Sequence, residues 1–214
     1  MPTPVRQLID MFRREVDDPY VPGGNVSHPD EDSLWKDEEI TGYLVEAQNE
    51  LSRRTLHFNS MKDVTFQAGD KVIPHPEGFL DLRAAYLVDG ISHTELVQRN
   101  LNEVDAIVRP DYGVQGAGNW LTDVGPPQAL VGDVETASFR MVPIPEKGGT
   151  ITLMYYRYPI PQFVGTTGQI EYTDPQYIRA IMHWMKNLGY AKQDAETLDL
   201  QRSQQFEAKF FAAA

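Results

Sequence analysis

The sequence has no cysteine, no long apolar run and few basic residues. Without cysteine the chain can form no disulfide, no thiolate metal site and no cysteine nucleophile. No stretch approaches the roughly 18 consecutive apolar residues of a membrane span, and the first residues lead into an amphipathic segment instead of a signal peptide. The 19 Lys and Arg stand against 31 Asp and Glu, so the formal net charge is −12. We therefore expect neither a membrane protein, nor a disulfide-rich secreted protein, nor a protein that grips nucleic acid over a broad surface.

Both ends of the 214-residue chain have the apolar spacing of helices. Val5 to Val16 forms one apolar stripe, with Thr3 as a candidate N-cap. A stronger helix is predicted over 37–57, where three acidic residues occupy the first turn. Towards the C-terminus, Asp174-Pro175 is typical of a cap followed by a first-turn proline, and a final helix is predicted from about Asp199.

The middle of the chain changes to the period of two that is typical of strands. Residues 64–67 and 72–73 predict a short hairpin. Residues 82–88 and 91–94 predict a second hairpin around Asp89-Gly90. Further strands are predicted at 129–131, 139–142 and 150–158, and a short helix at 102–108. The sequence thus predicts an α+β fold: a helical bundle from residues 1–60 and 174–214, with an inserted, mostly antiparallel β domain over 61–173.

No set of residues in the sequence predicts catalysis, metal binding or a cofactor. The acidic residues at 30–32 and 37–39, near His28, lack the spacing of a calcium loop, and we interpret them as a solvated loop and helix-dipole charges. The five histidines are scattered, and no serine elbow or phosphate loop is present. A metal-dependent hydrolase using Asp30, Asp32 and Glu38 stays open as a minor alternative, but we expect no enzyme.

Aromatic residues and long loops offer possible interaction sites. Tyr155, Tyr156 and Tyr158 either pack in a half-buried strand or, as an alternative function, form a receptor- or glycan-binding surface together with Trp120. The terminal aromatic residues Phe206, Phe210 and Phe211 add no stability unless they dock on their own bundle or on a neighbour. The loop over 17–33 and the Gly- and Pro-rich segment 109–127 are longer than most connections in a compact domain.

Several segments, in the right order, resemble tailed-phage head-to-tail adaptor (connector) proteins. The helix ending in Asp17-Asp18 and the motif of 34–40, continuing through 43–50, resemble the opening helices of that family. Residues 125–130, 139–145 and 151–159 resemble its β part, and 178–184, 190–197 and 206–210 its closing helices. Two features differ from the family: Lys36 stands where a capping Ser or Thr is usual, and the loop over 17–33 is longer.

The resemblance implies a structural virion protein that forms a ring, commonly of twelve copies. Such a ring joins the portal to the tail or nozzle proteins in the virion neck and lines the genome exit channel. Its expected partners are other copies of itself, the portal protein, tail proteins and, as a passing ligand only, genomic DNA; no membrane is involved. We expect Phe206, Phe210 and Phe211 to contribute to portal docking, and the loops around Asn25 and Trp120 to meet neighbouring subunits. The chain would be made in the bacterial cytoplasm.

Overall fold

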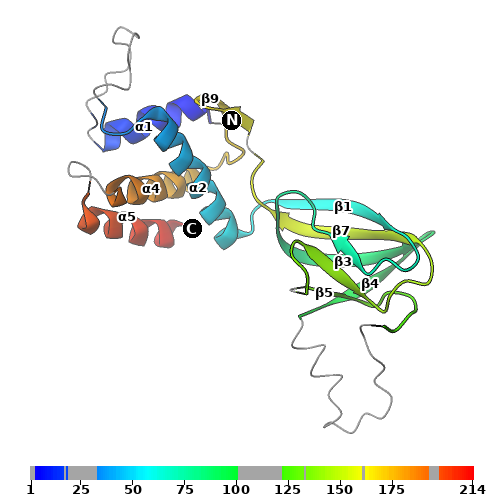
Figure 1. The fold of residues 1–214 in the computed structure, drawn as a ribbon. Coiled ribbons are helices and arrows are strands. Elements are labelled where there is room, and N and C mark those ends of the chain that lie inside the picture. Colours follow the sequence, from blue (N-terminus) through cyan, green and yellow to red (C-terminus); the bar gives the residue numbers. More distant parts are fainter. Residues whose placement is uncertain are drawn as a thin grey trace, which may run out of the picture. The chain divides into compact units, whose positions relative to one another are not determined.

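The computed structural model describes residues 3–16, 18, 33–100, 122–132, 134–160, 162–192 and 198–214 (Figure 1). They form two compact units, one from Met1–His57 with Tyr158–Ala214 and one from Phe58–Arg157. The chain enters and leaves the second unit at adjacent points, because the Arg157 N–H donates to the Phe58 carbonyl at 3.0 Å. The fold is α+β, as predicted.

The first unit, here called the helical unit, contains the helices from both ends of the chain. Helices α2 and α4 pack on each other, α5 packs on α4, and α1 contacts both α2 and α4. A two-stranded hairpin, which the sequence did not predict, lies in the same unit, where Gln169 bridges Pro4. The element bounds are α1 (Val5–Glu15), α2 (Asp37–Thr55), β8 (Gln162–Val164), β9 (Thr167–Gln169), α4 (Pro175–Ala191) and α5 (Leu200–Ala213).

Local caps explain where α2, α4 and α5 begin. The Asp174 carboxylate accepts the Gln176 N–H at 2.8 Å, and Asp199 accepts the Arg202 N–H at 3.0 Å. At α2 the Lys36 N–H donates to the Glu39 carboxylate at 2.9 Å, which supplies half of a capping box without a Ser or Thr. Helix α1 follows Pro4 with no side-chain cap, so the prediction that Thr3 caps it is wrong.

Trp35 lies at the centre of the helical unit's core. Its ring meets Phe12 edge-on at 5.6 Å and Tyr190 at 6.4 Å, and its Nε1–H donates to the Gly189 carbonyl at 3.2 Å. A Cβ at Gly189 would stand 2.8 Å from the Phe12 ring. The glycine therefore lets α4 approach the two aromatic rings closely.

The second unit, here called the β unit, is a seven-stranded sheet that is nearly barrel-shaped. Its strand order is β1-β7-β3-β4-β5-β6-β2, and every neighbouring pair is antiparallel except β4 with β5. The bounds are β1 (Asn59–Phe66), β2 (Val72–Pro74), β3 (Phe79–Asp89), β4 (Ser92–Arg99), β5 (Ala129–Val131), β6 (Ser138–Val142) and β7 (Gly149–Arg157).

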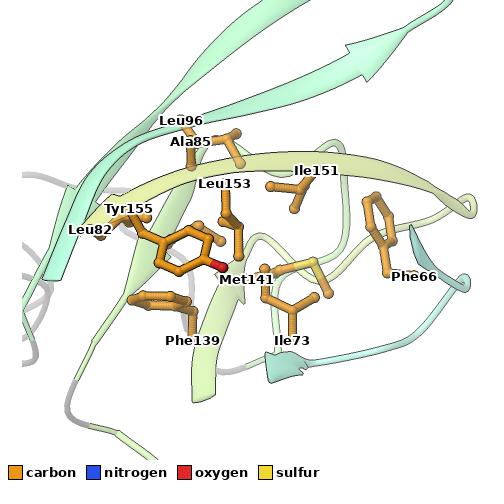
Figure 2. Close-up of a cluster of buried hydrophobic side chains, with 11 residues drawn as sticks. Phe66, Ile73, Leu82, Ala85, Leu96, Phe139, Met141, Ile151, Leu153 and Tyr155 are labelled. Atoms are coloured by element: carbon orange, nitrogen blue, oxygen red, sulfur yellow. The ribbon is translucent and has the colours of Figure 1, made fainter. Parts of the chain in front are cut away.

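An apolar cluster fills the inside of this sheet (Figure 2). The alternation of side chains along each strand places apolar residues on this inner face. In β7, Ile151, Leu153 and Tyr155 are buried while the residues between them face outward, as predicted. The cluster contains Phe66, Ile73, Leu82, Ala85, Leu96, Leu130, Phe139, Met141, Ile151, Leu153 and Tyr155.

The strand pairings differ from the sequence prediction in one hairpin and agree in another. Strands β1 and β2 do not form the predicted hairpin: β1 pairs with β7, and β2 pairs with β6. The predicted β3–β4 hairpin is confirmed, but Asp89 pairs with Ser92, so the turn residues are Gly90 and Ile91. Gly90 has a φ of 60°, the positive value that the first residue of a two-residue turn requires. The helix predicted at 102–108 lies outside the described residues.

Candidate functional site: interaction surfaces of the helical unit

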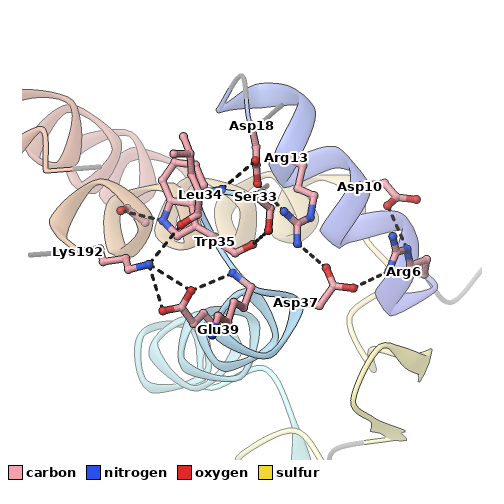
Figure 3. A network of polar contacts seen from close by, with 12 residues as sticks. Arg6, Asp10, Arg13, Asp18, Ser33, Leu34, Trp35, Asp37, Glu39 and Lys192 are labelled. Carbon is pink, nitrogen blue, oxygen red and sulfur yellow. Dashed lines mark hydrogen bonds and ion pairs between the residues drawn. The ribbon is translucent and has the colours of Figure 1, made fainter. Parts of the chain in front are cut away.

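A network of charged residues joins α1 to the start of α2 (Figure 3). Arg13 is almost fully buried and donates to Asp18 at 2.5 Å and to Asp37 at 2.6 Å. Asp37 also accepts from Arg6 at 2.7 Å, and Arg6 pairs with Asp10 one turn along α1. The Asp18 side chain is fully shielded from water, and Arg13 places an opposite charge directly beside it.

The same network fixes the two ends of the long loop predicted at 17–33. The second oxygen of Asp18 accepts the Leu34 N–H at 3.2 Å, and Ser33 donates to the Trp35 carbonyl at 3.1 Å. Lys192, just after α4, donates to the Leu34 carbonyl at 3.2 Å and pairs with Glu39 at 3.2 Å. Helices α1, α2 and α4 thus all hold the entry and exit of this loop.

The sequence analysis missed this network, and one signal could have indicated it. Arg13 stands four residues after Ile9 and one after Phe12, on the buried side of α1. A buried arginine needs carboxylate partners, because an unpaired charge is very unfavourable away from water. Which acidic residues supply the partners could not be read from spacing, since Asp37 lies 24 residues away.

The three aromatic residues predicted to dock on a partner lie in different environments on α5. Phe210 is fully buried against Trp184, with ring centroids 4.7 Å apart. Phe206 is half-buried and stacks on His183 and on Tyr190, each at 5.9 Å. Phe210 and Phe206 therefore hold α5 on α4.

Phe211 is the aromatic residue that α5 presents to solvent. The residue is 46% exposed, and the Arg54 guanidinium lies 4.1 Å from its ring centroid. A cation over an aromatic ring stabilises the ring's position without covering its other face. Asn25 and Trp120, the two loop residues predicted to meet neighbours, lie outside the described residues.

The tyrosine-rich strand does not gather its rings on one surface. Tyr155 is buried in the core of the β unit, while Tyr156 faces outward and is half-buried. Tyr158 belongs to the helical unit, where its hydroxyl accepts from Arg53 Nε at 3.0 Å. These positions support packing for Tyr155, and no shared binding face of the three rings is found in the described part of the chain.

Among the described residues, no three His, Asp or Glu side chains come together in a way that could hold a metal ion. Glu38 is exposed on α2, and Asp30 and Asp32 lie outside the description. Burial lowers the pKa of the His183 imidazole, and the nearby charges of Lys186 and Lys209 lower it further. His183 is therefore a packed, neutral side chain near pH 7. None of the helices in the described ranges is both long and apolar enough to cross a membrane.

A comparison with protein families gives a match. A family model described as "SU10 adaptor protein" matches residues 3–214, which is nearly the whole chain. No curated protein matches the sequence. The match includes all the helices and strands that surround the surfaces described above.

Proposed function

The chain belongs to the SU10 adaptor protein family, a family of phage adaptor proteins, and from this premise we propose that it joins the portal to the tail in the virion neck. The family match over nearly the whole chain is the observation that carries the proposal. In this proposal the protein is structural and has no catalytic role. Its partners are other copies of itself, the portal protein and tail or nozzle proteins.

We propose further that the subunits form a ring, of twelve copies as in the resemblance noted above, around the genome exit channel. The net charge of −12 per subunit supports this arrangement. A negatively charged lumen does not attract the DNA phosphates, so DNA can pass without adhering. The purified protein should accordingly bind little DNA at physiological salt, and tight binding would argue against a channel lining.

Portal docking is assigned to the end of α5, with Phe211 as the main contact. Phe211 is an exposed aromatic ring at the end of the last helix. Phe210 and Phe206 instead pack on other aromatic rings inside the helical unit. Large aromatic side chains are enriched among the residues that carry most binding energy at interfaces. The loops around Asn25 and Trp120 are assigned to neighbouring subunits on sequence grounds alone.

Particle assembly with altered α5 ends tests the proposal. Deleting residues 204–214 should give capsids that package DNA but leak it or lack tails. Because that deletion also removes the buried Phe210, the sharper variant is Phe211→Ser, which should leave the helical content unchanged and still reduce tail attachment. Lys209→Ser, another exposed change on α5, is the matched control and should have little effect. Normal infectious particles from both the deletion and Phe211→Ser would overturn portal docking through α5.

A further inference from the structure

Helices α1 and α4 leave a groove between them in the helical unit. The groove has a volume of about 510 Å³. Gln7 and Met11 line it from α1, and Ile178, Arg179 and Met182 line it from α4. Gln7 and Met11 are four residues apart, and Ile178 and Arg179 stand four and three residues before Met182, so each helix contributes one continuous stripe. A groove between two helices whose lining includes two methionines, Met11 and Met182, is the kind of surface that accepts a third helix.

The charged side chain of this groove that is left for a partner is positive. Arg179 is exposed at its edge and makes no ion pair or hydrogen bond with any residue in the described ranges. The acidic residue of the groove, Glu15, is paired with Lys186. The occupant that this groove fits is therefore a helix with an acidic face.

Helix α2 carries such a face. Glu38, Gly42 and Glu46 follow one another at four-residue spacing and are all exposed. Within the described part of the chain, Glu38 and Glu46 take part in no ion pair. The residues of α2 that pack inside its own unit, such as Ile40, Leu44 and Leu51, lie on the opposite side of the helix.

Gly42 is the second feature of this face. A glycine inside a helix is less favourable than alanine by roughly 1 kcal/mol. A Cβ at Gly42 would meet nothing within 4 Å, so packing within the subunit does not require a glycine there. A helix without a side chain at that position lets another helix approach closely. The glycine therefore fits a surface that contacts a partner.

The groove and the acidic face lie on different sides of the same unit. Helices α1, α2 and α4 contact one another in pairs. The groove opens between α1 and α4, whereas the acidic face of α2 is turned away from the residues that α2 buries. Two different surfaces that are complementary to each other generate head-to-tail contacts, which close into a ring when the rotation allows.

We propose that the Glu38–Gly42–Glu46 face of α2 docks in the α1–α4 groove of a neighbouring copy, with Arg179 facing the glutamates. This inference rests on the proposed ring and names the surfaces that would form it. Gly42 would lie against Met11 and Met182, and the charges would set the register of the two helices.

Cross-linking tests the contact directly, because the natural chain has no cysteine. A full-length chain carrying both Glu46→Cys and Arg179→Cys should, after mild oxidation of assembled particles, give a ladder of disulfide-linked multimers that collapses on reduction. A chain carrying Glu46→Cys and Gln205→Cys is the control, since Gln205 is exposed on α5, and it should give no ladder. A ladder from the control alone, or from neither pair, would overturn the proposed contact.

Charge reversal gives an independent test on the same two residues. Arg179→Glu and Glu46→Arg should each lower the number of copies incorporated per particle by roughly tenfold, because like charges then face each other. The double variant should recover most of that loss. All three chains should show unchanged circular dichroism and thermal unfolding, since both residues are exposed. Single reversals that incorporate as well as the natural chain would refute the pairing.

These outcomes separate this inference from the proposed function. Suppose that a ring is found in the neck, but the chain carrying Glu46→Cys with Arg179→Cys gives no cross-link between subunits. Other surfaces would then form the ring, and the adaptor function would stand. Absence of the natural chain from particles would instead reject the adaptor function itself.

Discussion

The helical unit and the β unit are each stabilised internally, and the interactions inside them differ. The β unit encloses a cluster of eleven residues that is apolar apart from one tyrosine hydroxyl. The helical unit buries more charged side chains, Arg13, Asp18 and Lys186, whereas Arg140 is the buried charged residue in the described part of the β unit. The polar network of the helical unit also holds Asp18 and Ser33, and within the described residues Glu38, Glu46 and Arg179 on its surface take part in no ion pair.

From this difference we propose that the units have separate roles within one subunit. An apolar core and non-local strand pairing make the β unit a scaffold whose stability depends on packing. Buried ion pairs add little net stability, but they are sensitive to the loss of either partner and fix the arrangement of the helices that they join. We propose that the two units are separate domains, and that the helical unit carries the main contacts of the assembly.

Arg13→Ala should show the largest effect on the helical unit. It would leave Asp18 buried without its cationic partner, which costs about 3–5 kcal/mol of unfolding free energy. Urea unfolding followed by circular dichroism measures the change. Arg14→Ala on the exposed side of α1 is the control and should change stability by less than about 0.5 kcal/mol. Equal effects of the two substitutions would contradict the role given to the network.

Leu153→Ala is the corresponding test of the β unit. Truncating this fully buried residue should lower the unfolding free energy by about 2–5 kcal/mol, through lost apolar burial and a cavity. Met154→Ala changes the next residue, which faces the other side of β7 and is only half-buried, so its effect should be clearly smaller. If Met154→Ala is the more harmful change, the assignment of the inner face is wrong.

Substituting alanine for each of two helix glycines should change the stability of the protein in opposite directions. Gly189→Ala brings a Cβ to 2.8 Å from Phe12 and should destabilise the protein by about 1–3 kcal/mol. Gly42→Ala meets open space and should stabilise the isolated subunit by up to about 1 kcal/mol. Thermal unfolding of both variants checks this. A destabilised Gly42→Ala subunit would mean that Gly42 serves its own fold and not a neighbour.

The smallest effect concerns pH and His183. Its pKa is lowered in the folded state, so the unfolded chain binds the proton more readily. This histidine's contribution to stability is therefore complete above the ordinary value of about 6.5 and falls as the pH drops through that value towards the folded pKa. His183→Asn should make stability less dependent on pH between about 7 and 5. An unchanged slope in denaturant unfolding across that range would contradict the burial of this ring.

Local signals explain which parts of the fold could be predicted. Asp174-Pro175 and Asp199 mark the starts of α4 and α5 because a cap acts on the next few backbone amides. The β3–β4 hairpin is similarly local. The β1–β7 pairing joins Val64 to Ile151, and nothing in either short segment selects that distant partner over nearby β2.

The same distinction applies to the interaction surfaces. The resemblance of several segments identified the family, and the spacing of apolar residues predicted α2 and α5. The separation of buried Phe210 from exposed Phe211 required the packing of α5 on Trp184. The groove between α1 and α4 joins segments from opposite ends of the sequence, so it exists only in the folded unit.

Electron cryo-microscopy of purified particles tests the central claim most directly. The account predicts that this polypeptide forms a ring between the portal and the tail, with the end of α5 against the portal. A neck built without this chain, or the chain located elsewhere in the particle, would contradict it.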